Sequence, residues 1–173
     1  PNIVTVHAVG QADGIHFLEM EFIAGRSMQQ LINDEGQLTI PRALSLAART
    51  ADGLAAAHRD DIIHRDVKPD NIMLTKRGDP KISDFGLAKR VLNSKGKPVA
   101  EEICGTPNYM APELFQGKEA SPASDVYALG VTLYLALTGR LPYLAESLQH
   151  LRWKGRNEPI PNVRRVRSDV PLE

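Results

Sequence analysis

The run VYALGVTLYLALTG, residues 126–139, is the feature that most limits how this chain can fold. Wound as a helix it is apolar on nearly every side, and Gly139 supplies a stop signal. Ser124 or Asp125 supplies the expected start. A helix without a polar face is stable only inside a core, so the other elements are expected to surround this one.

Strands are expected mainly near the start of the chain. Residues 2–9 and 15–22 alternate apolar and polar positions and are joined by GQADG, residues 10–14, which predicts a hairpin. Three shorter strand-like pieces follow at 62–64, 71–74 and 81–83. Strands at one end and helices elsewhere indicate the α+β class.

Two helices are expected between the hairpin and the shorter strands, and a weaker one later. Ser27 precedes a short helix that ends near Gly36, and Thr39 with Pro41 precedes a longer one. A weaker helix is expected over 145–154, ending at Gly155. The apolar stripe of the longer helix is expected to contain Leu44, Ala47, Ala48, Ala51, Leu54, Ala55 and His58.

Composition excludes some classes of function. Lysine plus arginine and aspartate plus glutamate both number 21, so charge gives no argument for a nucleic-acid or membrane partner. Cys104 is the only cysteine, has no C-x-x-C partner, and fits a reducing, cytoplasmic compartment. No apolar run approaches the roughly 18 residues of a membrane span. The basic tail, 159–171, is expected to be a solvated surface. The chain reads as part of a longer protein that could carry a membrane anchor elsewhere.

The segment HRDVKPDN, residues 64–71, carries the clearest chemistry, together with DFG at 84–86. Phosphoryl transfer needs a carboxylate for the attacking hydroxyl, a cation near the phosphate and oxygen ligands for Mg²⁺. Asp66 can meet the first need and Lys68 the second. Asn71 and Asp84 can meet the third.

The conjunction of HRDxKxxN, DFG, APE at 111–113 and a capped apolar helix resembles the eukaryotic-type serine/threonine protein kinase family. The resemblance covers essentially the whole chain, and the sequence of the chain resembles bacterial members of the family. It implies a protein-kinase-like α+β fold. Residues 1–24 would be the last two strands of the small lobe and the hinge, and residues 25–173 the helical large lobe, truncated before its last helices.

The resemblance implies a role for each motif residue. Asp66 would be the catalytic base, Lys68 the phosphate-side cation, and Asn71 and Asp84 the Mg²⁺ ligands. His64 and Phe85 would belong to the hydrophobic spine behind the site, and Asp125 would hold the backbone of the 64–65 turn by hydrogen bonding.

The resemblance also implies a nucleotide site at the hinge, MEFIAG, residues 20–25. Met20 would be the gatekeeper at the back of the adenine pocket. The carbonyl of Glu21 and the amide of Ile23 would meet the adenine edge, and Met73 would pack under the ring. Ser27 would lie near the ribose. An edge strand leading to a turn is the alternative interpretation of this segment.

The activation segment ends in EEICGTPNYMAPE, residues 101–113, where Thr106 and Glu113 match family hallmarks. In many relatives a phosphothreonine four residues before the GTP threonine pairs with the arginine that corresponds to Arg65. That position is Glu102 here. We therefore hypothesise that Glu102, with or without Glu101, pairs with Arg65 and partly replaces a phosphate. The alternative is that both glutamates are simply solvated.

The resemblance implies transfer of the ATP γ-phosphate to a serine or threonine hydroxyl of a protein, with Mg²⁺ or, as a substitute, Mn²⁺. The isolated chain is expected to be inactive, because it contains neither a Gly-x-Gly-x-x-Gly loop nor a V-A-I-K lysine. Two alternatives stay open: a pseudokinase that only binds, and a small-molecule phosphotransferase of the aminoglycoside type. The sequence leaves dimerisation undecided.

Overall fold

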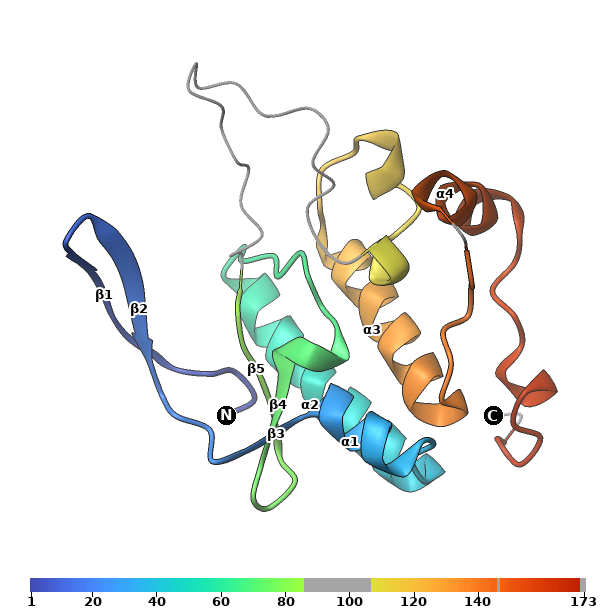
Figure 1. Cartoon of the computed structure of the whole chain (residues 1–173), viewed down its shortest axis with the longest axis horizontal. Coiled ribbons are helices and arrows are strands. Elements are labelled where there is room, and N and C mark those ends of the chain that lie inside the picture. Colours follow the sequence, from blue (N-terminus) through green and yellow to red (C-terminus); the bar gives the residue numbers. More distant parts are fainter. Residues whose placement is uncertain (86–106, 146, 172–173) are drawn as a thin grey trace.

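The computed structural model describes residues 1–85, 107–145 and 147–171, and places a hairpin at one end of a mostly helical body (Figure 1). This arrangement confirms the α+β class. No helix in the described ranges combines the length and apolar character that crossing a bilayer requires. The elements are β1 (Val6–Ala12), β2 (Ile15–Met20), β3 (Gly25–Ser27), α1 (Met28–Glu35), α2 (Ile40–Arg59), η1 (Pro69–Asn71), β4 (Ile72–Thr75), β5 (Pro80–Ile82), η2 (Pro107–Tyr109), η3 (Leu114–Gln116), α3 (Pro122–Thr138), α4 (Leu148–Asn157) and η4 (Val163–Arg165).

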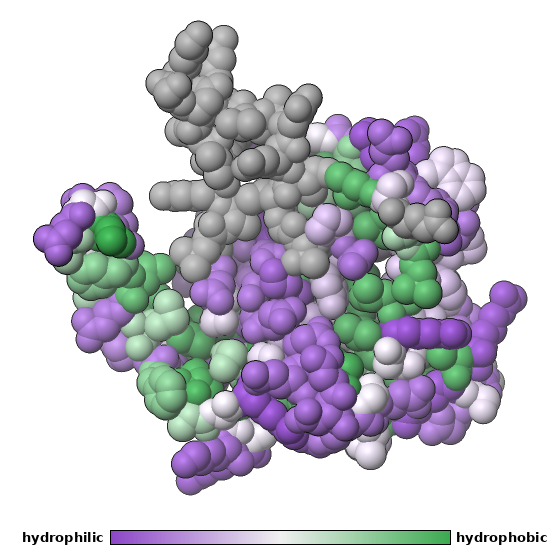
Figure 2. Space-filling model, viewed as in Figure 1, coloured by the Kyte–Doolittle hydropathy of each residue, from purple (hydrophilic) through white to green (hydrophobic). Residues whose placement is uncertain are grey.

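The hairpin forms as expected, but its turn is shorter than the predicted GQADG. Strands β1 and β2 pair antiparallel, and β1 continues to Ala12. The turn is Asp13-Gly14, whose φ angles are 51° and 79°. Asp and Gly tolerate this left-handed conformation, which matches the twist of the flanking strands. Apolar side chains are exposed along this hairpin, including Val9 at 74% and Ile15 at 71% (Figure 2).

A second sheet, in the order β3-β4-β5, connects the hairpin to the helices. The N-terminal residues join it, since the amide of Val4 donates to the carbonyl of Ile82 (2.8 Å). Gly25 permits the close approach of β3 to β4, because a Cβ there would lie 1.7 Å from the carbonyl oxygen of Leu74. The strand predicted over 62–64 is wrong: this segment is irregular, and the amide of His64 is bound by the side chain of Asp125 instead of a neighbouring strand.

Helix α1 begins and ends as predicted, with a capping box between Ser27 and Gln30 and with Gly36 at its end. Helix α2 begins after Thr39, also as predicted. The predicted apolar stripe of α2 is wrong for most members. The buried positions are Ala43, Leu46, Thr50, Gly53, Leu54 and Ala57, so that only Leu54 is shared with the prediction.

Helix α3 is the buried centre of the fold, as its sequence predicts, and packs against α2. Its N-cap is Ser121, so the predicted start at Ser124 or Asp125 is wrong by about one turn. Ser124 occupies the third helical position and completes a capping box with Ser121. Gly139 ends the helix at φ 70°, as expected.

The C-terminal part departs from two expectations. Helix α4 begins at Leu148, directly after its N-cap Ser147, and continues through Gly155 to Asn157. The predicted end of this helix at Gly155 is therefore wrong. The tail is not wholly solvated, because Arg167 is mostly buried and donates to the carbonyls of Leu38 and Leu137. These carbonyls lie near the start of α2 and the end of α3. Arg167 therefore attaches the tail to the helical body.

Candidate active site

The loop from His64 to Asn71 is held from below by a buried carboxylate on α3. Asp125 is 1% exposed and accepts hydrogen bonds from the amides of His64 (2.8 Å) and Arg65 (2.9 Å). It also accepts a bond from the ring of His58 (2.8 Å), a residue that the sequence assigned to an apolar stripe. Arg65 has φ 72°, a costly conformation for a residue with a side chain. The bonds to Asp125 stabilise this turn, which is the contact that the resemblance implies.

His64 connects the loop to the segment that carries Asp84. The ring is fully buried, and its Nδ1 accepts from the amide of Asp66 (3.2 Å), which leaves Nε2 to donate to the carbonyl of Ser83 (2.9 Å). The ring also packs on Phe85, with centroids 4.6 Å apart. Burial lowers the pKa of His64, because desolvation disfavours the charged imidazolium. A neutral ring is the form that this hydrogen-bond pattern requires.

The polar side chains of the loop converge on Asp66. The Nζ of Lys68 lies 2.7 Å from its Oδ2, and the Nδ2 of Asn71 lies 3.2 Å from the same oxygen. Asn71 also donates to the backbone carbonyl of Asp66 (2.8 Å). These contacts hold the carboxylate in place. They also occupy the amide nitrogen of Asn71, so that the amide oxygen is the atom left to accept or to bind a cation.

Asp84 follows β5 and lies beside Asn71. The amide of Ser83 donates to the carbonyl of Asn71 (2.9 Å), and the Ser83 hydroxyl lies 3.2 Å from Oδ2 of Asp84. A carboxylate oxygen and an amide oxygen therefore stand on adjacent segments, and both are ligands that Mg²⁺ accepts. The described residues contain no group of three or more Asp, Glu, His or Cys side chains that could hold a metal ion by themselves. An ion held here would need phosphate or water oxygens to complete its shell.

The hinge segment is tied to β5 by an ion pair that sequence reasoning missed. Oε1 of Glu21 lies 2.6 Å from the Nζ of Lys81, and the same oxygen accepts from the amide of Thr5 (2.8 Å). The hydrogen bond from Lys81 lowers the pKa of Glu21 below its ordinary value. A lysine among the apolar residues of a short strand is the signal that could have suggested a carboxylate partner.

A cavity of about 60 Å³ lies between the hairpin and the segment that contains Asp84. Met20, the expected gatekeeper, lines it, and Met73 lies on β4 opposite Ser27. The lining is mostly apolar and consists of Val4, Val6, Leu18, Met20, Ile82, Ser83, Asp84 and Phe85.

Comparison with known proteins identifies the family. The protein kinase domain matches residues 1–171. The chain belongs to the protein kinase family. PrkC, a serine/threonine-protein kinase of Bacillus subtilis, is 34% identical over 171 residues, which is 99% of this chain and 26% of PrkC. The probable serine/threonine-protein kinase pknA2 of Bifidobacterium longum is 36% identical over 170 residues, 96% of this chain and 22% of pknA2. The serine/threonine-protein kinase PknK of Mycobacterium tuberculosis is 42% identical over 171 residues, 95% of this chain and 15% of PknK.

These relatives are bacterial, in line with the sequence resemblance. The kinase chain spans about a quarter or less of the length of each of them. The family assignment therefore applies to this segment, and the division into 1–24 and 25–173 stays a prediction.

The predicted activation segment is described only in its last part. Glu113 lies immediately before η3 and is partly buried, and the side chain of Arg65 is exposed. The remaining predicted positions, Glu101, Glu102, Cys104 and Thr106, lie outside the described residues. So does Ser94, which with Thr106 is the only serine or threonine between DFG and APE. The hypothesis that Glu102 replaces a phosphate therefore stays a prediction.

Proposed function

We propose that this kinase domain transfers the γ-phosphate of ATP to a serine or threonine hydroxyl of a protein. The convergence of Lys68 and Asn71 on the carboxylate of Asp66, with Asp84 on the adjacent segment, is the observation that carries the proposal. Phosphoryl transfer relies mainly on positioning and charge neutralisation, and this cluster supplies both.

Each residue has a distinct part in the proposal. Asp66 orients the acceptor hydroxyl and takes its proton, while Lys68 places positive charge beside the transferred phosphate. Asn71 and Asp84 hold Mg²⁺, which neutralises phosphate charge when it is bound. His64 and Asp125 position the loop and do not touch the reacting atoms.

The nucleotide is proposed to lie against the hinge. The carbonyl of Glu21 and the amide of Ile23 would contact the adenine edge, and Met73 would pack under the ring. The link between Glu21 and Lys81 supports this placement, because it connects the hinge to the strand that leads to Asp84. A serine or threonine acceptor is supported by Lys68, which matches that branch of the family, and by the names of the relatives.

The test is phosphorylation by the full-length protein with radioactive ATP and a generic basic protein substrate. We expect incorporation on serine or threonine, and Asp66→Asn is expected to lower kcat by at least about a hundredfold. Asp70→Asn is the matched control, because Asp70 is exposed in the same loop. The isolated 173-residue chain is expected to turn over negligibly.

Two outcomes would replace the proposal. ATP binding without transfer to any protein, itself included, would indicate a pseudokinase. Transfer to a small alcohol but not to protein would indicate a small-molecule phosphotransferase. Equal activity of wild type and Asp66→Asn would exclude Asp66 as the base.

A further inference from the structure

An open groove of about 500 Å³ lies at the end of β4 and β5 that is remote from Asn71 and Asp84. The turn between these strands forms one wall, and the start of α2 contributes to the other. Leu74, the lining residue of β4 that is nearest to Asn71 in sequence, lies three residues from it, or roughly 10 Å along the strand. The lining consists of Gly25, Arg26, Arg42, Leu74, Thr75, Lys76, Arg77 and Gly78.

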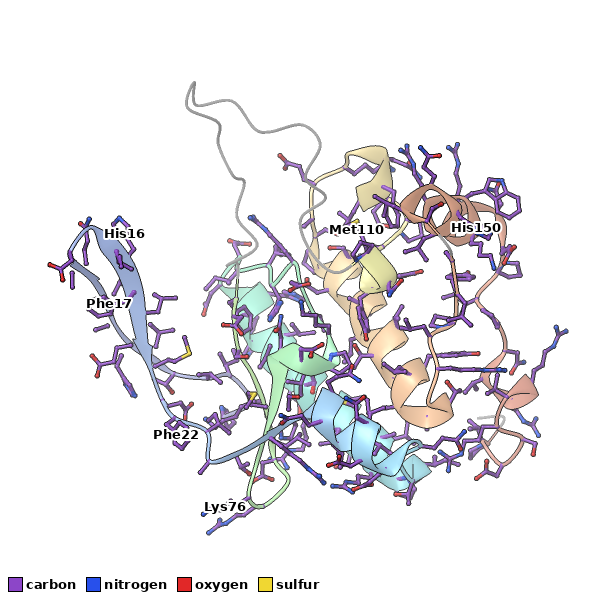
Figure 3. All side chains as sticks on the ribbon, in the orientation of Figure 1. His16, Phe17, Phe22, Lys76, Met110 and His150 are labelled. Carbon is purple, nitrogen blue, oxygen red and sulfur yellow. The ribbon has the colours of Figure 1, made fainter. Side chains whose placement is uncertain are left out.

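Four of the eight lining residues are cations and none is an acid. Lys76 and Arg77 are exposed in the turn, and neither has an ion pair or hydrogen bond within the described part of the chain. Lys76 points away from the body at the tip of this turn (Figure 3). The nearby acid Asp79 is already paired with Arg49. The turn at the edge of the groove therefore carries two positive charges, on Lys76 and Arg77, that no acid in the described residues compensates.

The other two cations are oriented by acids at the end of α1. Glu35 lies 3.4 Å from Arg26 and 2.9 Å from Arg42, and Asp34 lies 2.8 Å from Arg26. A guanidinium group has five N–H donors, so each arginine keeps donors beyond those that these contacts use. Glu35 thus holds two guanidinium groups at the edge of the groove, and each keeps N–H donors that these contacts do not use.

The floor of the groove is backbone and short side chains. Gly25 brings β3 against the carbonyl of Leu74, and any side chain there would force the strands apart. Leu74 is buried and Thr75 is partly buried, so neither fills the space above the sheet. The result is an open groove whose cations come from the turn between β4 and β5, from β3 and from the start of α2.

We propose that this groove binds a short acidic segment of another protein, rich in aspartate and glutamate. Arginine forks match carboxylates in geometry, and the two uncompensated cations supply net attraction. A nucleic acid or a membrane surface is disfavoured, because both require a more extended positive field and this chain has a formal net charge of +0. In the proposed kinase, the segment would belong to a protein substrate that docks away from Asp66; this last step rests on the proposed function.

The test measures binding separately from catalysis. A fluorescent eight-residue peptide of alternating Asp and Glu, and its Asn/Gln counterpart, are titrated with the full-length protein and followed by anisotropy. Only the acidic peptide is expected to bind. The double variant K76E/R77E should weaken its affinity by about tenfold or more. The control R152E/R156E changes the charge equally on exposed positions of α4 and should stay within about twofold.

Three results would overturn the proposal that the groove binds an acidic segment. These are absence of acidic-peptide binding, equal losses in both double variants, and stronger competition by an RNA oligonucleotide or phosphatidylserine vesicles than by free acidic peptide. The Asp66→Asn variant should bind the peptide like wild type, so failure of the proposed catalysis is distinguishable from failure of the groove. In phosphorylation assays, K76E/R77E should raise KM for substrates with an acidic segment and leave kcat for short neutral peptides unchanged.

Discussion

At the scale of single residues, the loop from His64 to Asn71 depends on two buried groups, the charged carboxylate of Asp125 and the neutral ring of His64. Asp125 is buried as an acceptor with three donors, which offset the loss of water around it. His64 is buried with one donating and one accepting nitrogen, which only the neutral ring provides. Protonation of His64 would place a second N–H against the amide of Asp66.

We expect the stability of the kinase domain to decrease in mild acid because of His64. Burial holds its folded pKa below the ordinary value of about 6.5, so the unfolded chain binds the proton more readily. The stabilising contribution is therefore complete above about pH 6.5 and is lost as the pH falls through the folded pKa. Urea midpoints measured from pH 7.5 to 5 should fall for wild type. The decrease in urea midpoint should be smaller for His64→Phe than for wild type. His150→Phe, at an exposed site, should show the same decrease as wild type. Identical pH profiles for wild type and His64→Phe would contradict this account.

At the scale of elements, periodicity located the helices better than their buried faces. Alanine occurs all around α2, so several stripes fit a helical period about equally well. The packing partners decided between them: Gly53 faces Asn2 and Ile82, which approach too closely for a larger residue. Capping residues located some helix ends, since Ser27, Gly36 and Gly139 lie where the sequence placed them, but they misplaced the start of α3 and the end of α4.

Two leucines on α2 provide a direct test of its buried face. Leu46 is 4% exposed, whereas Leu44, which the periodicity assigned to the core, is 49% exposed. Leu46→Ala should lower the free energy of unfolding by about 2–5 kcal/mol, because it leaves a cavity. Leu44→Ala should lower it by less than about 1 kcal/mol. Urea unfolding of both variants, followed by far-UV circular dichroism, gives the comparison; similar losses would show that α2 is rotated from the described position.

At the scale of the whole molecule, the motifs predicted residues of the candidate site and the contact of Asp125 with the 64–65 turn, but not the ion pair between the hinge segment and β5. HRDxKxxN and DFG are local patterns, so Asp66, Lys68, Asn71 and Asp84 could be chosen from spacing and chemistry. Lys81 has no motif, and its partner Glu21 lies 60 residues earlier in the chain. Such a pair depends on how β5 meets the hinge, which no local pattern encodes.

The pair of Glu21 and Lys81 is expected to tune nucleotide affinity in the proposed kinase. Replacing Lys81 by Met removes the charge, keeps the stem, and frees the hinge carboxylate. We expect KM for ATP to rise by up to about fivefold, since a partly exposed pair contributes roughly 0–1 kcal/mol. KM for the peptide substrate should not change. The measurement is the steady-state kinetics of the full-length protein, with Lys76→Met as the control. Equal KM values for ATP in the two variants would contradict a role of the Glu21–Lys81 pair in nucleotide affinity.

The last prediction concerns the activation state of the whole domain. Arg65 has its backbone fixed by Asp125 and its side chain exposed next to Asp66, so a negative group could order the activation segment through it. If Glu102 is that group, Glu102→Gln and Arg65→Ala should reduce the kcat of the unphosphorylated full-length kinase to a similar extent. The double variant should then lose little more, because both changes break one interaction. Ser94→Ala should have no effect. Full activity of Glu102→Gln together with an inactive Ser94→Ala would instead assign the switch to phosphorylation.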